Sequence, residues 1–119
     1  MRYEVVKIMN NQAMASSGNS TIVDLRNVID LSVQFIVTSA AAPTGTAAIL
    51  FANDCIVSPN GTISGGNFGP DPTVTAPVIT ANGVKLVNVI ETGHLFAQVQ
   101  FTTGSGTGVL NVNVGTKGA

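Results

Sequence analysis

The sequence predicts an all-β protein: a single β-sandwich of about eight short antiparallel strands in a jelly-roll-like order. Apolar and polar residues alternate with period two along several segments, which is typical of half-buried strands. Clusters of Gly, Pro and Asn separate these segments at spacings of about eight to twelve residues. The 119 residues suit one domain with one modest core.

Three segments show the clearest alternation. Leu31–Thr38, Leu95–Thr102 and Leu110–Val114 each place apolar residues on one face and mostly uncharged polar residues on the other. This pattern predicts strands with one face on the core and one toward solvent. Weaker patterns predict further strands at Tyr3–Met9, Thr21–Leu25, Gly45–Asn53, Thr73–Thr80 and Gly83–Ile90.

Turn residues suggest how some of these strands are joined. Asn82-Gly83 is a strong signal for a tight hairpin, here between Thr73–Thr80 and Gly83–Ile90. The segment Thr102–Thr107 contains two glycines and is expected to join the last two strands as a looser hairpin.

The N-terminal residues 1–19 are expected to form a strand or arm with a connector, and residues 20–119 the sandwich domain. Asn10–Asn19 is rich in Asn, Ser, Ala and Gly, which suits a flexible connector. Such a connector would let Tyr3–Met9 reach a neighbouring subunit. A first strand and a long loop within one subunit fit the sequence equally well.

Charged side chains are scarce. They make up 9% of the residues, against about a quarter in ordinary soluble domains, and the formal net charge is −1. No Lys or Arg occurs from Asn27 through Val84. Because soluble monomers usually carry interspersed charge and a net charge away from zero, we expect a homo-oligomer whose faces are largely covered by other subunits.

The composition also argues against several classes of partner. The five basic residues form no cluster, so direct nucleic-acid binding is not expected. No apolar run is long enough to span a bilayer, and the first residues lack the apolar region of a secretory signal. Cys55 is the single cysteine, which fits a chain made in a reducing cytoplasm.

One predicted strand, Gly45–Asn53, is apolar on both faces. Such a strand usually has something packed on each side, here either the Gly-rich segment Thr62–Asp71 or another subunit. The first face consists of Ala47, Ile49 and Phe51. The second face consists of Ala48, Leu50 and Ala52, and it is the favoured interface with other subunits. The other predicted interface residues are Ile36, Tyr3 and Val5.

Few side chains suit catalysis, and we expect that the protein is not an enzyme and binds no cofactor. His94 is the only histidine and has Glu91 nearby in sequence, but a structural or surface role suits it better than that of a catalytic base. Cys55 has neither a CxxC partner nor a basic neighbour within five residues, which indicates an unreactive thiol.

The remaining carboxylates are expected to serve local structure. Asp24 and Arg26 suit an ordinary ion pair on a bend. Four side chains carry oxygen atoms that could bind a calcium ion or form turns: Asn53, Asp54, Asn67 and Asp71. Turn formation is favoured, because the sequence has no dense calcium-loop motif.

Short motifs in the second half of the chain resemble one family. They are Gly45-Thr46, Ala52-Asn53-Asp54, Asn88-Val89 before the strand Gly93–Phe101, the closing segment Thr103–Val112 and Gly115–Gly118. The series resembles small β-sandwich virion structural proteins of bacteriophages and covers roughly residues 20–118. The chain departs from the family pattern at Ala52, where the family has Ser. It also lacks a Trp after Asn53-Asp54, and a Tyr- and Arg-rich strand is replaced by His94–Gln98.

The resemblance implies a structural protein of a virion, made in the host cytoplasm, with other virion proteins as partners. A capsid vertex, minor capsid or decoration subunit is expected, since the chain is short for a shell protein. The alternative is a receptor- or carbohydrate-binding module on a tail or spike, with its site on Ser58–Pro72 and Thr102–Thr107. The absence of Trp argues against a typical sugar platform. An enzyme based on His94 and Glu91 is the third interpretation.

Overall fold

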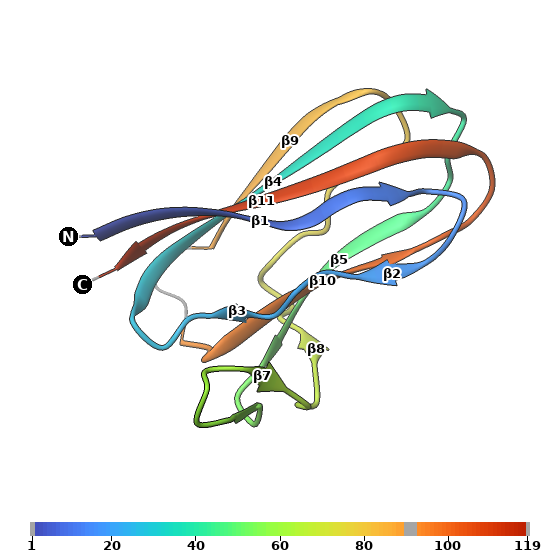
Figure 1. Cartoon of the computed structure of the whole chain (residues 1–119). Coiled ribbons are helices and arrows are strands. Elements are labelled where there is room, and N and C mark those ends of the chain that lie inside the picture. The colour runs from blue at the N-terminus through green and yellow to red at the C-terminus, as the bar shows by residue number, and fades with distance from the viewer. Residues whose placement is uncertain (1, 90–92, 119) are drawn as a thin grey trace.

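The computed structural model describes residues 2–89 and 93–118, and the regular structure in these residues consists of eleven strands (Figure 1). The described part of the chain contains no helix that is long and apolar enough to cross a membrane. The six longer strands are β1 (Arg2–Ala13), β4 (Val28–Ala41), β5 (Thr46–Ala52), β9 (Gly83–Val89), β10 (Phe96–Thr102) and β11 (Thr107–Gly118). The two-residue strands are β2 (Gly18–Asn19), β3 (Val23–Asp24), β6 (Ile56–Val57), β7 (Ile63–Ser64) and β8 (Gly69–Pro70).

Two antiparallel sheets form the body of the molecule. Sheet A has the order β1-β11-β4-β9, and sheet B has the order β2-β10-β5-β8, with β3 also paired to β10. Strands β6 and β7 form a separate small hairpin. In Figure 1 this hairpin lies beyond sheet B, away from sheet A.

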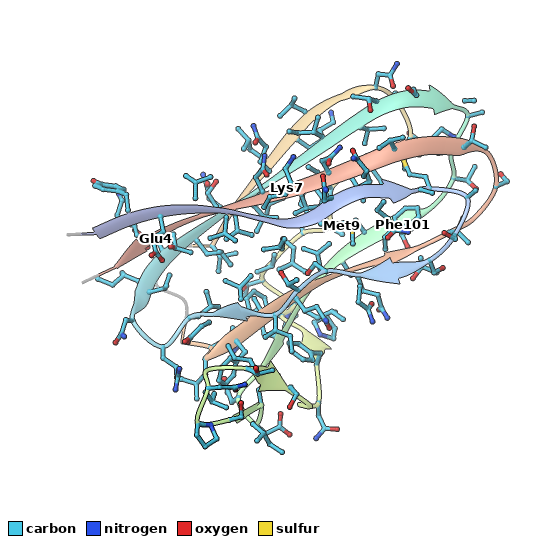
Figure 2. All side chains as sticks on the ribbon, viewed as in Figure 1. Glu4, Lys7, Met9 and Phe101 are labelled. Carbon is cyan, nitrogen blue, oxygen red and sulfur yellow. The ribbon has the colours of Figure 1, made fainter. Side chains whose placement is uncertain are left out.

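The core lies between the two sheets and confirms the predicted alternation. Phe35 and Val112 of sheet A and Phe101 of sheet B have no exposed surface. Figure 2 shows Phe101 between the sheets, and its ring lies so close to Gly45 that a side chain there would collide with it. Burial of such side chains contributes about 1.5–3 kcal/mol each and holds the two sheets together.

The strand count and both predicted hairpins are corrected by the structure. Eleven strands replace the expected eight, and Thr21–Leu25 contributes only the short strand β3. Thr73–Thr80 is not a strand, because Pro77 fixes φ and lacks the N–H that a ladder needs. Instead, Val74 and Ile79 anchor this segment to the core.

The Asn82-Gly83 turn therefore joins no hairpin. Strand β9 pairs with β4, far back in the sequence, and not with the predicted partner Thr73–Thr80. The Asn82 side-chain oxygen accepts a 2.8 Å hydrogen bond from the backbone N–H of Ala40 on β4. This contact fixes the start of β9 beside β4 and gives Asn82 a role other than the predicted turn.

The expected hairpin at Thr102–Thr107 is also wrong. This segment carries the chain from β10 in sheet B to β11 in sheet A, and the two strands do not pair with each other. Thr103 donates its hydroxyl to the Met14 carbonyl at 2.7 Å, and the Ser105 N–H donates to Thr44 Oγ1 at 2.6 Å. The alternation of the two strands is alike, so the sequence pattern could not show that they belong to different sheets.

The N-terminal segment is more regular than expected. Strand β1 runs through the first four residues of the predicted connector Asn10–Asn19, and β2 occupies its last two. Asn11 has a φ of 51°, and its N–H donates to Asn111 Oδ1 at 2.9 Å, within a region of two register shifts. Strand β1 pairs with β11 of the same chain. Exchange of this strand between copies stays a prediction.

Candidate functional site

The six predicted interface residues lie on two different faces of the molecule. Tyr3, Val5 and Ile36 point outward from sheet A, and Ala48, Leu50 and Ala52 lie on the outward side of sheet B. They therefore form no single patch. Each outer face has to be considered separately as a candidate interaction surface.

The outer face of sheet A alternates with core residues along each strand. Its central part, the neutral patch, covers β11, β4 and β9 and contains no ionisable side chain. The patch consists of Asn111, Asn113, Gly115, Ser32, Gln34, Ile36, Val84, Leu86 and Asn88.

Amide and apolar side chains are arranged in rows across the neutral patch. Asn113 on β11 donates a 3.1 Å hydrogen bond from its side-chain nitrogen to Gln34 Oε1 on β4. On the other side of Gln34 lies Leu86 of β9, which is 66% exposed. In the next row Ile36 lies beside Val84, which is 54% exposed. Large apolar side chains this exposed are a common mark of an interaction surface when they are adjacent.

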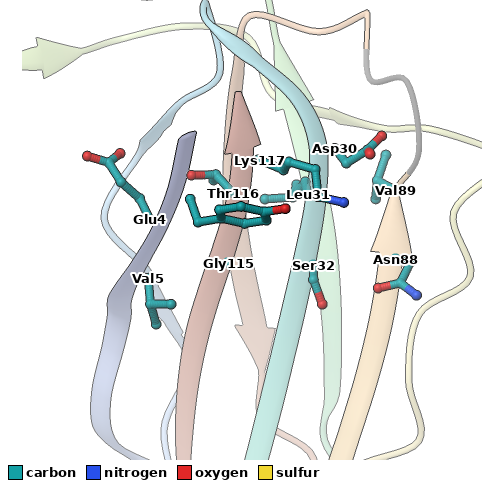
Figure 3. A pocket seen from close by; sticks show the side chains of 11 residues that line it. Glu4, Val5, Asp30, Leu31, Ser32, Asn88, Val89, Gly115, Thr116 and Lys117 are labelled. Carbon is teal, nitrogen blue, oxygen red and sulfur yellow. The ribbon is translucent and has the colours of Figure 1, made fainter. Parts of the chain in front are cut away.

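A groove of about 410 Å³ lies at the end of sheet A where the two chain termini meet. Figure 3 shows Val5 of β1 on one side of the groove, Asn88 of β9 on the other, and Gly115 between them. Because Gly115 has no side chain, the surface is low at this position. The ring of Tyr3 lies beside the groove with the Lys117 ammonium 5.6 Å from its centroid.

The outer face of sheet B is partly covered by its own chain. Ala52 is 5% exposed, and a Cβ placed on Gly66 would lie 3.5 Å from the Ala52 Cβ. Leu50 is half-buried and lies opposite Pro70 of β8. Of the two coverings that the sequence left open, the Gly-rich segment Thr62–Asp71 accounts for Ala52, and Leu50 and Ala48 remain partly accessible.

Polar groups on sheet B are also engaged within the chain. The Gln98 side-chain nitrogen donates to the Ser20 carbonyl at 3.0 Å. Arg26 lies over the ring of Phe96 at 5.8 Å from the centroid and forms the predicted ion pair with Asp24 at 2.8 Å. The hydrogen bond from the Arg26 side chain holds the pKa of Asp24 below its usual range.

His94 has a structural setting. Its Nε2 lies 2.8 Å from Asp71 Oδ2, and its ring stacks on Phe51 with centroids 4.4 Å apart. The Thr73 hydroxyl donates to the other oxygen of Asp71 at 2.6 Å. The Thr73 hydroxyl and then His94 lower the pKa of Asp71 to about 2. Glu91, the other residue of the enzyme interpretation, lies outside the described residues.

The predicted turn-forming side chains hold the segment after β5. Asp54 accepts two hydrogen bonds from Asn67, at 2.9 Å from the backbone N–H and 2.6 Å from the side chain. These bonds lower the pKa of Asp54. Asn53 accepts a 2.9 Å bond from the Leu95 N–H, and burial raises the pKa of the nearby Cys55 thiol. Within the described ranges, no three His, Cys, Asp or Glu side chains converge as a metal site would require.

The two loops assigned to the alternative function do not come together. β10 pairs with β5 from Phe96 opposite Ala52 to Thr102 opposite Thr46. Ser58–Pro72 follows the Ala52 end of this ladder, and Thr102–Thr107 begins at its other end. Because six residue steps along a strand span about 20 Å, the two loops cannot share one small binding site.

Sequence reasoning missed Val84 and Leu86 as surface residues. The signal was present, because the predicted strand Gly83–Ile90 has apolar residues on both faces, as Gly45–Asn53 does. In the structure, Val89 and part of Val87 face the core, while Val84 and Leu86 are exposed.

Comparison with known proteins gives a structural likeness but no family. No known family model matches the chain, and a search of curated proteins gives no significant match. The structure is similar to the crystal structure of the SPBc2 prophage-derived protein YomS, with a TM-score of 0.60. The likeness covers 97% of this chain and 92% of that chain at 8% sequence identity, so what the two share is the fold.

Proposed function

We propose that the protein is a structural subunit of a bacteriophage particle, acting by self-assembly and by contact with other capsid proteins. The proposed location is the virion, after synthesis in the host cytoplasm, as a capsid vertex, minor capsid or decoration subunit. The observation that carries the proposal is the neutral patch, which combines exposed apolar side chains with amides and has no charge. A surface of this kind suits contact with another protein better than permanent exposure to water.

The strand order supports a jelly-roll sandwich. If β2 and β3 are taken as one interrupted strand and the β6–β7 hairpin is set aside, eight strands remain. Numbered along the chain, they follow the order first-eighth-third-sixth in sheet A and second-seventh-fourth-fifth in sheet B. With this grouping, the order matches that expected of a jelly roll, an architecture found in viral capsid and lectin domains, and this match supports the proposed architecture.

The structural neighbour supports the phage setting. YomS is described as prophage-derived, and the two folds correspond over nearly the whole of both chains. A shared fold alone does not establish a shared function. The proposal therefore also rests on the low charge and on the family resemblance of the closing segment Thr103–Val112.

The proposal assigns no catalytic role, cofactor or direct nucleic-acid contact. His94 serves to hold Asp71 and the segment after β8 against Phe51. Asp54 and Asn67 close the preceding loop.

The groove beside Tyr3 favours one second candidate, a module that binds carbohydrate on a receptor. Tyr3 is 69% exposed, and Asp30, Ser32 and Asn88 line the same groove. A sugar can stack on an exposed aromatic ring and form hydrogen bonds with carboxylate, hydroxyl and amide groups beside it. Binding to a glycan array that disappears in Tyr3→Ala would favour this candidate over the first.

The test of the first proposal is the mass of the purified protein in solution. Analytical ultracentrifugation from micromolar to millimolar concentration is expected to show reversible association. Mass spectrometry of purified phage particles is expected to find the protein among their components. A species that stays monomeric at millimolar concentration and is absent from particles would overturn the proposal.

A further inference from the structure

We infer that the neutral patch on sheet A is the site at which a second copy of this chain binds, with Ile36, Val84 and Leu86 at the centre of the contact. The inference rests on the proposed function, because it names the surface through which self-assembly occurs. It assigns the principal contact to the outer face of sheet A, on the β9 side.

The exposed apolar side chains lie next to one another on this side. Val84 pairs with Ile36 across the β9–β4 ladder, and Leu86 follows Val84 on the same face of β9. Val84 and Leu86 are both more than half exposed. A neighbouring molecule that covered them would remove a continuous apolar surface from water, which is the main driving force of association.

Charged side chains of sheet A lie outside this centre. Lys85 of β9 is exposed but lies on the opposite face of the sheet, because it pairs with the core residue Phe35. Lys7, Asp30 and Lys117 point outward at the positions that border the patch on the β1 side and at the terminal end. An uncharged centre with ionised groups at its margin is the usual composition of a protein interface. Two copies can approach through such a centre without bringing like charges together or burying an ionised group.

The chemistry of the patch suits a second copy as the occupant. The Asn and Gln side chains each carry both hydrogen-bond donors and an acceptor, so a row of amides can bind an identical row. A two-fold dimer requires this kind of self-complementary surface. The molecule measures 41 × 27 × 26 Å. A broad face is therefore on the order of 1,000 Å², so a standard interface of roughly 800 Å² per partner would include the neutral patch and its charged margin.

Sheet B is less suited to be the principal contact. Ala52 and Phe96 on its outer side are already covered, with 5% and 3% of their surfaces exposed. The Gln98 amide is hydrogen-bonded to Ser20. The apolar surface that sheet B offers a neighbour is thus reduced to the partly accessible Ala48 and Leu50.

The experiment compares single lysine substitutions in the full chain. Leu86→Lys and Val84→Lys place a charge in the neutral patch, and Leu50→Lys places one on sheet B. Ile56→Lys is the matched control, because Ile56 is 67% exposed and lies on the separate β6–β7 hairpin. Sedimentation equilibrium gives the dissociation constant of each variant, and thermal melting by circular dichroism checks that each one is folded.

Leu86→Lys and Val84→Lys are expected to weaken association at least about tenfold, because a buried lysine must lose its water. In dilute protein, where all variants are monomeric, their melting temperatures are expected to match the wild type, since both side chains are largely exposed. Ile56→Lys should associate like the wild type. A spin label on Leu86→Cys in a Cys55→Ser chain should lose mobility as concentration rises.

Two results would overturn the inference and leave self-assembly standing. One is association of Leu86→Lys and Val84→Lys with wild-type affinity, and the other is a loss confined to Leu50→Lys. Equal weakening by Ile56→Lys would also overturn it, because the effect would then be one of charge alone. A monomeric wild type would instead remove the self-association in the proposed function itself.

Discussion

The outer faces of the two sheets come from similarly alternating strands but differ in how far the rest of the chain covers them. On sheet A the exposed side chains of β9 include Val84 and Leu86, which are 54% and 66% exposed. On sheet B the corresponding positions at the end of β5 and the start of β10 are Ala52 and Phe96, and both are buried. The difference comes from the segment after β5, which folds back so that Gly66 lies near Ala52 and β8 pairs with β5.

The comparison shows that strand alternation tells which side chains leave the core but not what covers them afterwards. A strand with two apolar faces can have its second face covered by its own chain, as at Ala52, or left for a partner, as we propose for Leu86. The two cases differ in how the molecule should respond to substitution.

The sharpest contrast is between an inward and an outward side chain. Phe101→Ala is expected to lower the free energy of unfolding by about 3–5 kcal/mol, because it leaves a cavity between the sheets at a site with no exposed surface. Leu86→Ala is expected to change it by less than about 0.5 kcal/mol. Urea denaturation measures both. A similar loss in the two variants would show that β9 packs differently.

The cover of sheet B can be tested at Gly66. Its φ is +92°, and a Cβ there would lie 2.6 Å from the Cys55 sulfur. Gly66→Ala is therefore expected to cost about 1–3 kcal/mol of stability and to make Cys55 react faster with a thiol reagent. Gly61→Ala is the control, because Gly61 has a φ of +88° but open space around it. Equal costs in both variants would mean that backbone strain alone is responsible.

A smaller effect is expected within the neutral patch. Asn113→Ala removes the hydrogen bond to Gln34 on the outer side of sheet A. The free energy of unfolding should fall by about 0.5–1.5 kcal/mol, the usual net value of such a bond. Thermal melting of dilute protein separates this loss from any change in association. An unchanged melting temperature would indicate that water replaces the bond without cost.

The smallest effect is expected at Asp71, and it should depend on pH. The pKa of Asp71 is lowered from 3.8 to about 2, so its ionised form stabilises the folded state above about pH 4. That contribution is lost as the pH falls from about 4 to about 2. The melting temperature of the wild type should exceed that of Asp71→Asn at pH 4 and approach it near pH 2. Parallel curves over this range would contradict the assignment.

Much of the fold could be predicted from the sequence, because alternation depends on local chemistry. The inward faces around Phe35, Phe101 and Val112 follow directly from it. The pairing of distant segments could not be predicted in the same way. β9 pairs with β4 instead of its neighbour in sequence, and the Thr102–Thr107 segment crosses between sheets. Both depend on contacts such as that of Asn82 with β4, which no local pattern encodes.

The candidate site was predicted only in part. Low charge indicated a covered surface, and Ile36, Tyr3 and Val5 do point outward from sheet A. The two-sided apolar pattern of Gly45–Asn53 favoured the face of Ala48, Leu50 and Ala52, and no local pattern ranks the face of sheet A above it. That ranking depends on where the segment after β5 folds, and hence on the hydrogen bonds between Asp54 and Asn67.

The position of β11 has a consequence for how the molecule folds. Residues 107–118 are late in the sequence but form an inner strand of sheet A, with β1 on one side and β4 on the other. During synthesis neither β1 nor β4 can pair with β11 until residues 107–118 have left the ribosome. Pairings this distant in sequence slow folding and leave the nascent protein open to aggregation.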